Sequence, residues 1–389
     1  MDNTYKTIFG LIDTAINGSG FQPDADIDWK AVFVEMDKQK IAALVGSLFA
    51  VMNIDAELRN RWRGYIISQR MHYDQLLQEH GRVFGLLKGM PSAVIKGTAA
   101  AIYYPDPLVR TMGDIDILVG RECHDKGRKI LQGKYDLDNS YEARHSCFRK
   151  GNVVIELHNR FGIKLESEKE GYFDGILFDA LPYVEKHDIE GVEIPVLPKT
   201  ENGLVILYHI VRHLQNGVGL RHVVDWMAYV SDSEPVDWEK FNMVSKKIGI
   251  YKFQCVITKT CEIYLGLRHW DDIDWCNYAD TSLCEKLMEY VISRGNFGRA
   301  MDSYAGKYAM KNIRGNLFRR LQIGGLCRWK AAARHKVLRP FAWLYQIVRI
   351  SKEILSRDNP IKSVKSDMKE AENVKKFLEE LGLERSSAM

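Results

Sequence analysis

The sequence has 389 residues and a formal net charge of +4, and 46% of its residues are hydrophobic while 27% are charged. These fractions are typical of a soluble globular protein, and the length predicts two or three domains with an ample core. No apolar run approaches the roughly 18 residues that a membrane-spanning helix requires, so we expect no transmembrane segment.

The N-terminal segment and the cysteines predict a cytoplasmic protein. The first residues, MDNTYKTIFGLIDTAING, contain two acidic residues and lack the basic region of a secretory signal. The seven cysteines are odd in number and irregularly spaced, which fits neither a disulfide framework nor a CxxC metal site. We expect them to be reduced thiols.

Residues 1–90 are predicted to form a helical N-terminal region. Apolar residues recur at helical spacing over residues 5–16, 29–52 and 56–88. No cluster of catalytic residue types occurs there, so we expect these helices to form a cap that packs against a following sheet.

Residues 91–200 are predicted to form the α/β part of the chain. The expected order is a strand at 93–96, a helix at 98–103, a strand at 114–119, a helix at 122–132 and strands near 144–149 and 152–158. After residue 163 the chain is acidic and loop-like as far as residues 192–198, which contain two prolines and predict a short edge strand.

The strand at residues 114–119 carries the strongest chemical signal. Its sequence, DIDILV, alternates two carboxylates with aliphatic residues, and side chains two positions apart on a strand point to the same face. Asp114 and Asp116 should therefore lie side by side, with Ile115 and Ile117 facing a core. Adjacent carboxylates repel each other unless a cation lies between them, and Mg²⁺ prefers such oxygen ligands. The alternative is a half-exposed edge strand whose aspartates are only solvated.

Two neighbouring segments could complete such a site. Before the strand, VIKGTAAA indicates a strand or turn that opens into a helix, where Gly97 would let the backbone approach an anion closely. After it, VVIELH places Glu156 and His158 on one face of a second strand. Glu156 could then supply a third carboxylate, while His158 could simply donate a hydrogen bond within the strand pair.

Together, the glycine-plus-hydroxyl turn, the helix, the Asp-x-Asp strand and the later carboxylate resemble the signature of the nucleotidyltransferase superfamily. The longer run KGTAAAIYYPDPLVRTMGDIDILV, followed by VVIELH and GLRHVVDW, is similar to the uncharacterised bacterial nucleotidyltransferase family 5 over residues 90–160, and more loosely through residue 230. The charged Lys96 before Gly97 and the long interval to Asp114 depart from the wider superfamily. The resemblance implies an α+β fold, with a small mixed-sheet nucleotidyltransferase core, a helical N-terminal cap and a helical C-terminal domain.

The resemblance also implies a reaction, the transfer of a nucleoside monophosphate from a nucleoside triphosphate to an acceptor with release of pyrophosphate. The expected co-substrate is ATP, and the expected cofactor is Mg²⁺, with two ions bound. The residues implied as catalytic and metal-binding are Asp114, Asp116 and Glu156, the last as a metal ligand or a general base. The residues implied in binding the phosphates are Lys96, Gly97, Thr98 and Arg110. For Arg110 the alternative is a salt bridge that stabilises its loop.

Residues 201–300 are predicted to be helical and to wall the cleft. His209 and His213 have the i, i+4 spacing of a metal site, but the glutamate of an HExxH motif is absent, so we do not expect zinc there. Arg221 and Asp225 have the same spacing, which suits an ion pair within one helix.

Residues 301–389 are predicted to form a basic helical C-terminal region. Residues 311–357 contain twelve Lys or Arg and one acidic residue, Glu353, with aromatic residues between the charges. Such a segment suits an anionic membrane surface, an anionic substrate, nucleic acid or an acidic partner. The alternative is a helix pair whose basic face is solvated or packs on the body of the protein.

Three other functions remain open at this point: a phosphoryl or phosphocholine-type transferase acting on a glycan, a catalytically silent nucleotide-binding module, and a scaffold that acts through its basic C-terminal region.

Overall fold

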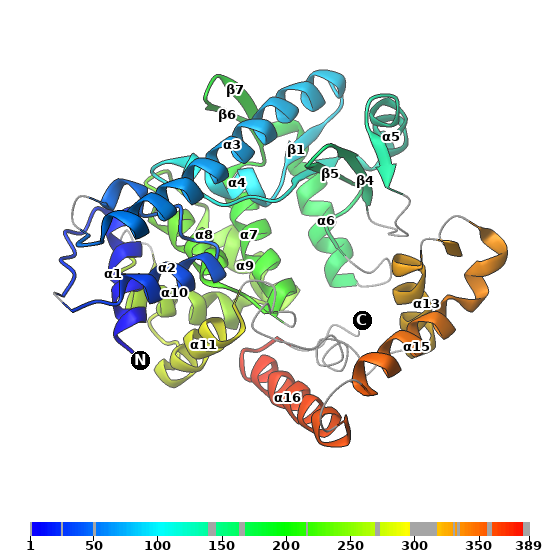
Figure 1. Ribbon diagram of the computed structural model, residues 1–389. Helices are drawn as coiled ribbons and strands as arrows, with labels where there is room; N and C mark the ends of the chain where they lie inside the picture. Colours follow the sequence, from blue (N-terminus) through cyan, green and yellow to red (C-terminus); the bar gives the residue numbers. More distant parts are fainter. Residues whose placement is uncertain are drawn as a thin grey trace.

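The computed structural model describes residues 2–24, 26–49, 52–138, 145–162, 168–214, 217–268, 273–295, 317–329, 331–332, 335–355 and 360–383. Its centre is a mixed seven-stranded sheet with the strand order β3-β4-β5-β2-β1-β7-β6. The strands are β1 (Ser92–Val94), β2 (Ile115–Val119), β3 (Asp136–Asp138), β4 (His145–Lys150), β5 (Val153–His158), β6 (Glu185–Ile189) and β7 (Val192–Val196). Figure 1 shows the long helix α3 (Ala56–Leu86) running beside this sheet, and most other helices gathered at one end of the molecule. The expected α+β class is confirmed.

The N-terminal region contains α1 (Asn3–Asn17), α2 (Trp29–Lys38) and α3. Each begins after an aspartate, Asp2, Asp28 or Asp55, whose side chain accepts a backbone N–H of the first turn. The predicted helices at 5–16 and 56–88 are confirmed. The single helix predicted over 29–52 is wrong, because α2 ends at Lys38 and the chain turns at Lys40, which has a left-handed φ of 60°.

The first two helices pack on other helices, whereas α3 packs on the sheet. Buried residues of α3, Tyr73, Leu76, Leu77 and Val83, join a core with the sheet residues Ile115, Ile117, Val119, Ile155 and Leu157. By contrast, α1 contacts α2, α8 (Leu220–Ser231) and α10 (Tyr251–Leu265). The expected cap on the sheet is therefore provided by α3.

On the opposite face of the sheet α4 (Gly97–Ala101) contacts β1 and β2, and α7 (Lys199–His213) and α8 pack on α4. Asn202 on α7 donates to the carbonyl oxygen of Ala99 at 2.7 Å and so joins α7 to α4. Gly203 permits close packing of α7 on α8, since a Cβ there would lie 2.1 Å from Cζ of Tyr229. These contacts hold α4 and its preceding turn firmly beside β2.

Two expectations for residues 164–198 are wrong. The segment expected to be a loop contains α6 (Glu168–Ala180) and β6. The segment 192–198 does form a strand, β7, but β7 lies between β1 and β6, so β6 is the edge strand. Pro195 is tolerated in β7 because β7 pairs with β1 only through Val94 and Val196.

The remaining helices within the described ranges are α5 (His124–Gln132), α9 (Trp238–Ile248), α11 (Thr281–Arg294), α13 (Leu317–Arg328), α15 (Ala342–Leu355) and α16 (Pro360–Glu380). The short 3₁₀ turns are Gly46–Leu48, Pro107–Val109, Arg121–Cys123, Leu181–Tyr183 and Lys336–Phe341. Among the described residues no helix combines the length and apolarity needed to cross a membrane. The predicted boundaries of four regions, 1–90, 91–200, 201–300 and 301–389, stay a prediction.

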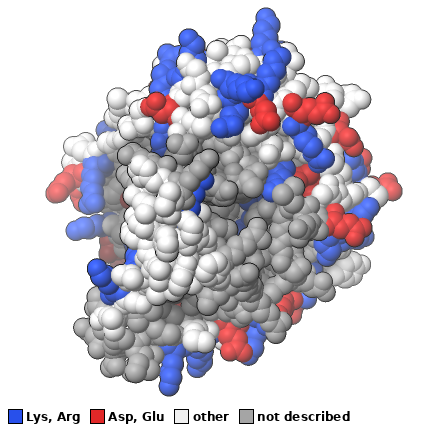
Figure 2. Space-filling model, turned by 90° about the vertical axis from the view of Figure 1, so that its right-hand side faces the viewer, with Lys and Arg blue, Asp and Glu red and all other residues white. Residues whose placement is uncertain are grey.

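The C-terminal helices α13 and α15 pack on each other, and α16 is joined to α11 by an ion pair between Arg294 and Glu370 at 2.7 Å. In the view of Figure 2 the described Lys and Arg side chains are interspersed with Asp and Glu along the upper and right-hand edges of this face. On α15 the apolar side chains of Leu344 and Val348 are exposed. Residues 311–316, 330, 333–334 and 356–357 of the basic segment 311–357 lie outside the described residues, and the role of the segment as a binding surface stays a prediction.

Candidate active site

Three carboxylates converge on one face of the sheet. Asp116 on β2 lies in register with Glu156 on the parallel strand β5, and Asp114 immediately precedes β2. One carboxylate oxygen from each of these residues lies within 4.8 Å of the other two. Ile115 and Ile117 point the opposite way into the core beneath α3, as the alternation predicts. The shared face of Asp114 and Asp116 is therefore built by strand geometry alone.

The three carboxylates differ in burial and charge. Asp116 is buried, while Asp114 and Glu156 are partly exposed. The negative charge of Asp116, together with burial and Glu156, raises the pKa of Asp114 to about 7. Burial alone would raise the pKa of Asp116, but Lys96 and His158 hold that pKa well below its usual range. The cluster has an excess of negative charge and suits a divalent cation.

The raised pKa of Asp114 makes a prediction about the metal-free protein. A folded-state pKa of about 7 lies above the ordinary value of 3.8, so the stability linked to Asp114 is present at low pH and is lost as the pH rises through about 7. We expect Asp114→Asn to remove this loss. In EDTA, the melting temperature of the variant relative to wild type should rise between about pH 5 and about pH 8. An equal difference at both pH values would show that Asp114 is not under this repulsion.

Lys96 has an unusual backbone conformation and directly contacts one of the three carboxylates. It has φ 62° and ψ −131°, a conformation rare for a residue with a side chain. Its ammonium donates to Oδ1 of Asp116 at 2.5 Å, and the side chain is almost fully buried. Backbone strain of this kind gathers at functional sites, where the surrounding structure holds it in place. Lys96 thus supplies a positive charge directly against the innermost carboxylate.

Gly97 and Thr98 begin the short helix α4 beside the carboxylates. A Cβ at Gly97 would make only ordinary contacts, 3.6 Å from the carbonyl oxygen of Asp114 and 3.8 Å from Sδ of Met112. The chain itself therefore does not require a glycine here. The Thr98 hydroxyl is 2.8 Å from Nε2 of His80 on α3, and burial lowers the pKa of His80 to about 3, so this histidine is neutral.

Arg110 forms a buried salt bridge with Asp225. A salt bridge that stabilises its loop was the alternative to the predicted role in phosphate binding. Its Nε and Nη2 each donate to one oxygen of Asp225 at 2.7 Å, and the Tyr104 hydroxyl donates to the same carboxylate at 2.7 Å. Both ionic side chains are about 95% buried. Arg221, one turn before Asp225 on α8, donates to the carbonyl oxygen of Thr111 at 3.1 Å and also feels the negative charge of Asp225. Arg110 thus fixes the loop before β2 to α8.

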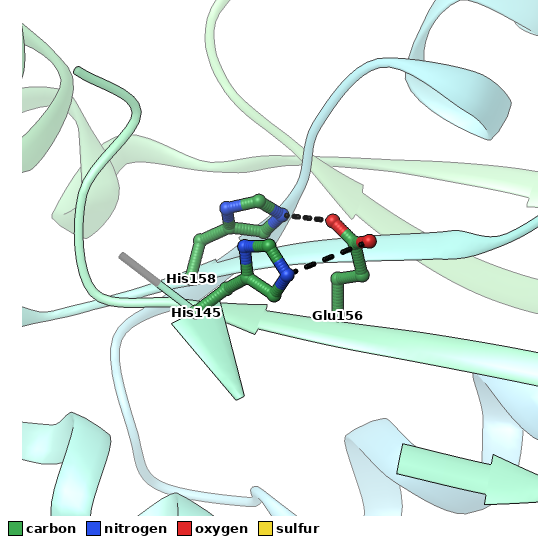
Figure 3. Close-up of side chains that lie close together, drawn as sticks. All are labelled: His145, Glu156 and His158. Carbon is green, nitrogen blue, oxygen red and sulfur yellow. Dashed lines mark ion pairs between the residues drawn. The ribbon is translucent and has the colours of Figure 1, made fainter. Parts of the chain in front are cut away.

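Two histidines, His145 and His158, lie beside Glu156 of the carboxylate cluster, as Figure 3 shows. Nε2 of His158 is 2.8 Å from Oδ1 of Asp116 and 3.2 Å from Oε2 of Glu156. Nε2 of His145, on β4, is 3.6 Å from Oε1 of Glu156. His145 was not predicted from the sequence to belong to the site, although Gly151 indicates the hairpin turn that brings it there. A two-residue turn at Gly151, where φ is 59°, sets an antiparallel register that pairs His145 with His158.

Three further histidines pack together on α7 and α8 rather than joining the carboxylates. The ring centroids of His209, His213 and His222 are 4.5 to 5.7 Å apart. Burial, followed by the neighbouring His213 and Lys96, lowers the pKa of His209 well below its usual value. Burial likewise lowers the pKa of His222, so His209 and His222 are neutral, and His209 lies near enough to Lys96 to feel its charge.

The mixed sheet thus presents three convergent carboxylates beside a strained turn and a short helix. The family described as "uncharacterised nucleotidyltransferase" matches residues 25–266, more than half of the chain, and the protein belongs to that family. It is thus an enzyme that transfers phosphorus-containing groups. Membership confirms the resemblance read from the KGTAAAIYYPDPLVRTMGDIDILV run.

Other similarities are weaker. No curated protein matches the chain. A crystal structure of an antigenic nucleotidyltransferase-like protein from Paracoccidioides brasiliensis matches with 15% sequence identity and a TM-score of 0.36, covering 50% of this chain and 94% of that one. A TM-score of this size is too low to show a shared fold.

Proposed function

We propose that the protein transfers a nucleoside monophosphate from a nucleoside triphosphate, with ATP as the first candidate, to a hydroxyl or phosphate acceptor, and that it depends on Mg²⁺. The observation that carries this proposal is the convergence of Asp114, Asp116 and Glu156 on one face of β2 and β5. An all-carboxylate donor set fits Mg²⁺, which favours oxygen ligands.

The three carboxylates would hold the metal, and their graded burial gives them different tasks. Asp116 is buried and fixed by Lys96 and His158, so it would form the rigid base of the site. Asp114 and Glu156 reach solvent and would face the nucleotide and the acceptor. When bound, Mg²⁺ would neutralise charge on the triphosphate and lower the pKa of an acceptor hydroxyl.

Lys96 is the residue best placed to serve the phosphates. Its ammonium contacts the carboxylate oxygen that a metal would also require, so metal binding at Asp116 would compete with Lys96 for that oxygen. The displaced ammonium would then be available to an anionic phosphate. Gly97 would keep the backbone beside it open to close approach. We assign Arg110 the role of positioning the loop before β2, since both of its paired nitrogens are engaged by Asp225.

Pyrophosphate release tests the proposal. The full chain is incubated with each of the four common nucleoside triphosphates and a dialysed cell extract as a source of acceptor, with Mg²⁺ or with EDTA. We expect Mg²⁺-dependent release of pyrophosphate from one nucleotide in preference to the others. Release of orthophosphate in its place would indicate a phosphoryl transferase. Nucleotide binding without any release would indicate a silent binding module.

A further inference from the structure

The cluster of His145, Glu156 and His158 has a donor set different from that of the three carboxylates. Each residue offers one ligand atom, and the three atoms lie within 4.8 Å of one another. Glu156 directs one oxygen toward each histidine, as Figure 3 shows. All three side chains come from the paired strands β4 and β5, in which His145 lies directly opposite His158. The sheet therefore fixes the backbone positions of all three residues.

The hydrogen bond of His158 with Asp116 accounts for only part of this convergence. The 3.6 Å separation of Nε2 of His145 and Oε1 of Glu156 exceeds the roughly 3.2 Å limit of a good hydrogen bond. Nε2 of His158 carries at most one proton, yet it faces both Asp116 and Glu156 at 2.8 and 3.2 Å. Ligands held about 2.0–2.2 Å from a common metal ion lie roughly 3–3.6 Å apart. Oε1 and Oε2 of Glu156 lie 3.6 and 3.2 Å from the nitrogens of His145 and His158, which is within this range.

We propose that His145, Glu156 and His158 form a binding site for a divalent transition-metal ion such as Zn²⁺, next to the all-carboxylate site and joined to it through Glu156. Neutral imidazole is a preferred ligand of zinc and its neighbours in the first transition series, whereas Mg²⁺ favours oxygen. Two histidines and one glutamate leave a coordination position open, as in zinc sites that bind a water or a substrate.

The surroundings favour a cation at this position. Asp116 lies beside His158, and Asp114 lies beside Asp116 and Glu156, so that three carboxylates gather here while Lys96 offsets part of their charge. His145 and His158 are almost fully buried, while the Glu156 side chain is 22% exposed and gives access from solvent. A metal ion here would orient Glu156, whichever reaction the neighbouring carboxylates support. The inference therefore rests on metal binding alone and not on the proposed transfer reaction.

Cobalt binding tests the inference, because Co²⁺ replaces Zn²⁺ at nitrogen and oxygen ligands and absorbs visible light. The full chain is first stripped with EDTA, dialysed and placed in excess Mg²⁺, so that the carboxylate site is occupied by Mg²⁺. We expect titrated Co²⁺ to give a visible absorption band that Zn²⁺ abolishes by displacement. We expect His145→Gln to weaken Co²⁺ binding about tenfold or more, because a ligand is lost. His187→Gln, on the edge strand β6, is the matched control and should bind as wild type does.

Two results would overturn the inference. One is wild-type protein that gives no Co²⁺ band in Mg²⁺, and the other is His145→Gln that binds as tightly as the control. Crystals of the wild-type protein soaked in Zn²⁺ provide a measurement that does not depend on a variant folding. Anomalous scattering should place the ion about 2.0–2.2 Å from Nε2 of His145 and of His158. An ion found only at the surface or only among the aspartates would contradict the proposal.

Discussion

Replacing Asp116 with Asn should lower the rate of nucleotidyl transfer by about 10³-fold or more. Asn keeps the volume of the side chain but removes the charge that would bind Mg²⁺, and electrostatic stabilisation of a developing pyrophosphate contributes several kcal/mol to the rate. Asp116 is the innermost of the three carboxylates and the one held by both Lys96 and His158. The measurement is Mg²⁺-dependent pyrophosphate release under saturating nucleotide.

The variant also disturbs a buried pair, so stability must be measured beside activity. Glu193→Gln, in an exposed ion pair with Lys186 on β6 and β7, is a control that removes one carboxylate charge far from the cluster. It should leave both rate and melting temperature nearly unchanged. If Asp116→Asn is folded and transfers nucleotide at close to the wild-type rate, the assignment of Asp116 to the metal is wrong.

The second large effect concerns the pair of Arg110 with Asp225. Asp225→Ala should lower the free energy of unfolding by about 3–5 kcal/mol, because it leaves a buried guanidinium without its counter-charge. Asp225 also accepts a hydrogen bond from Tyr104, so one substitution removes the partner of two buried donors. Chemical denaturation of wild type and variant measures the difference.

A double replacement separates a structural role from a role in binding phosphate. Arg110→Met combined with Asp225→Leu removes both charges and should recover much of the stability lost in Asp225→Ala. Its KM for nucleotide should then stay near that of wild type. A stable double variant with a strongly raised KM for nucleotide would instead show that Arg110 binds the phosphates, as its position in the loop before β2 first indicated.

Local sequence patterns were sufficient to predict the carboxylate face. The alternation in DIDILV put Asp114 and Asp116 on one face, and the same rule put Glu156 and His158 together on the next strand. The structure places β5 parallel to β2 with Asp116 opposite Glu156. The helical segments 5–16 and 56–88 were equally predictable from the sequence, because their periodicity and capping aspartates are local features.

Features that depend on contacts between distant segments could not be predicted from the sequence. The i, i+4 rule brings Arg221 near Asp225, but it cannot predict the pairing of Asp225 with Arg110, which lies 115 positions away and reaches Asp225 from the loop before β2. No local sequence pattern predicts the positive φ of Lys96, whose side chain contacts Asp116, 20 positions further along the chain. The internal place of β7 depends on which strands pair, and no periodicity encodes that choice.

The most direct test of the central claim is calorimetric titration of the preferred nucleoside triphosphate, in Mg²⁺, into wild-type protein and into the double variant Asp114→Asn/Asp116→Asn. Both substitutions preserve volume, so circular dichroism can establish that the variant is folded before the titration. We predict measurable binding to wild type and none to the double variant. Equal affinity of the two proteins for the Mg²⁺-bound nucleotide would contradict the assignment of the carboxylates to metal and nucleotide binding.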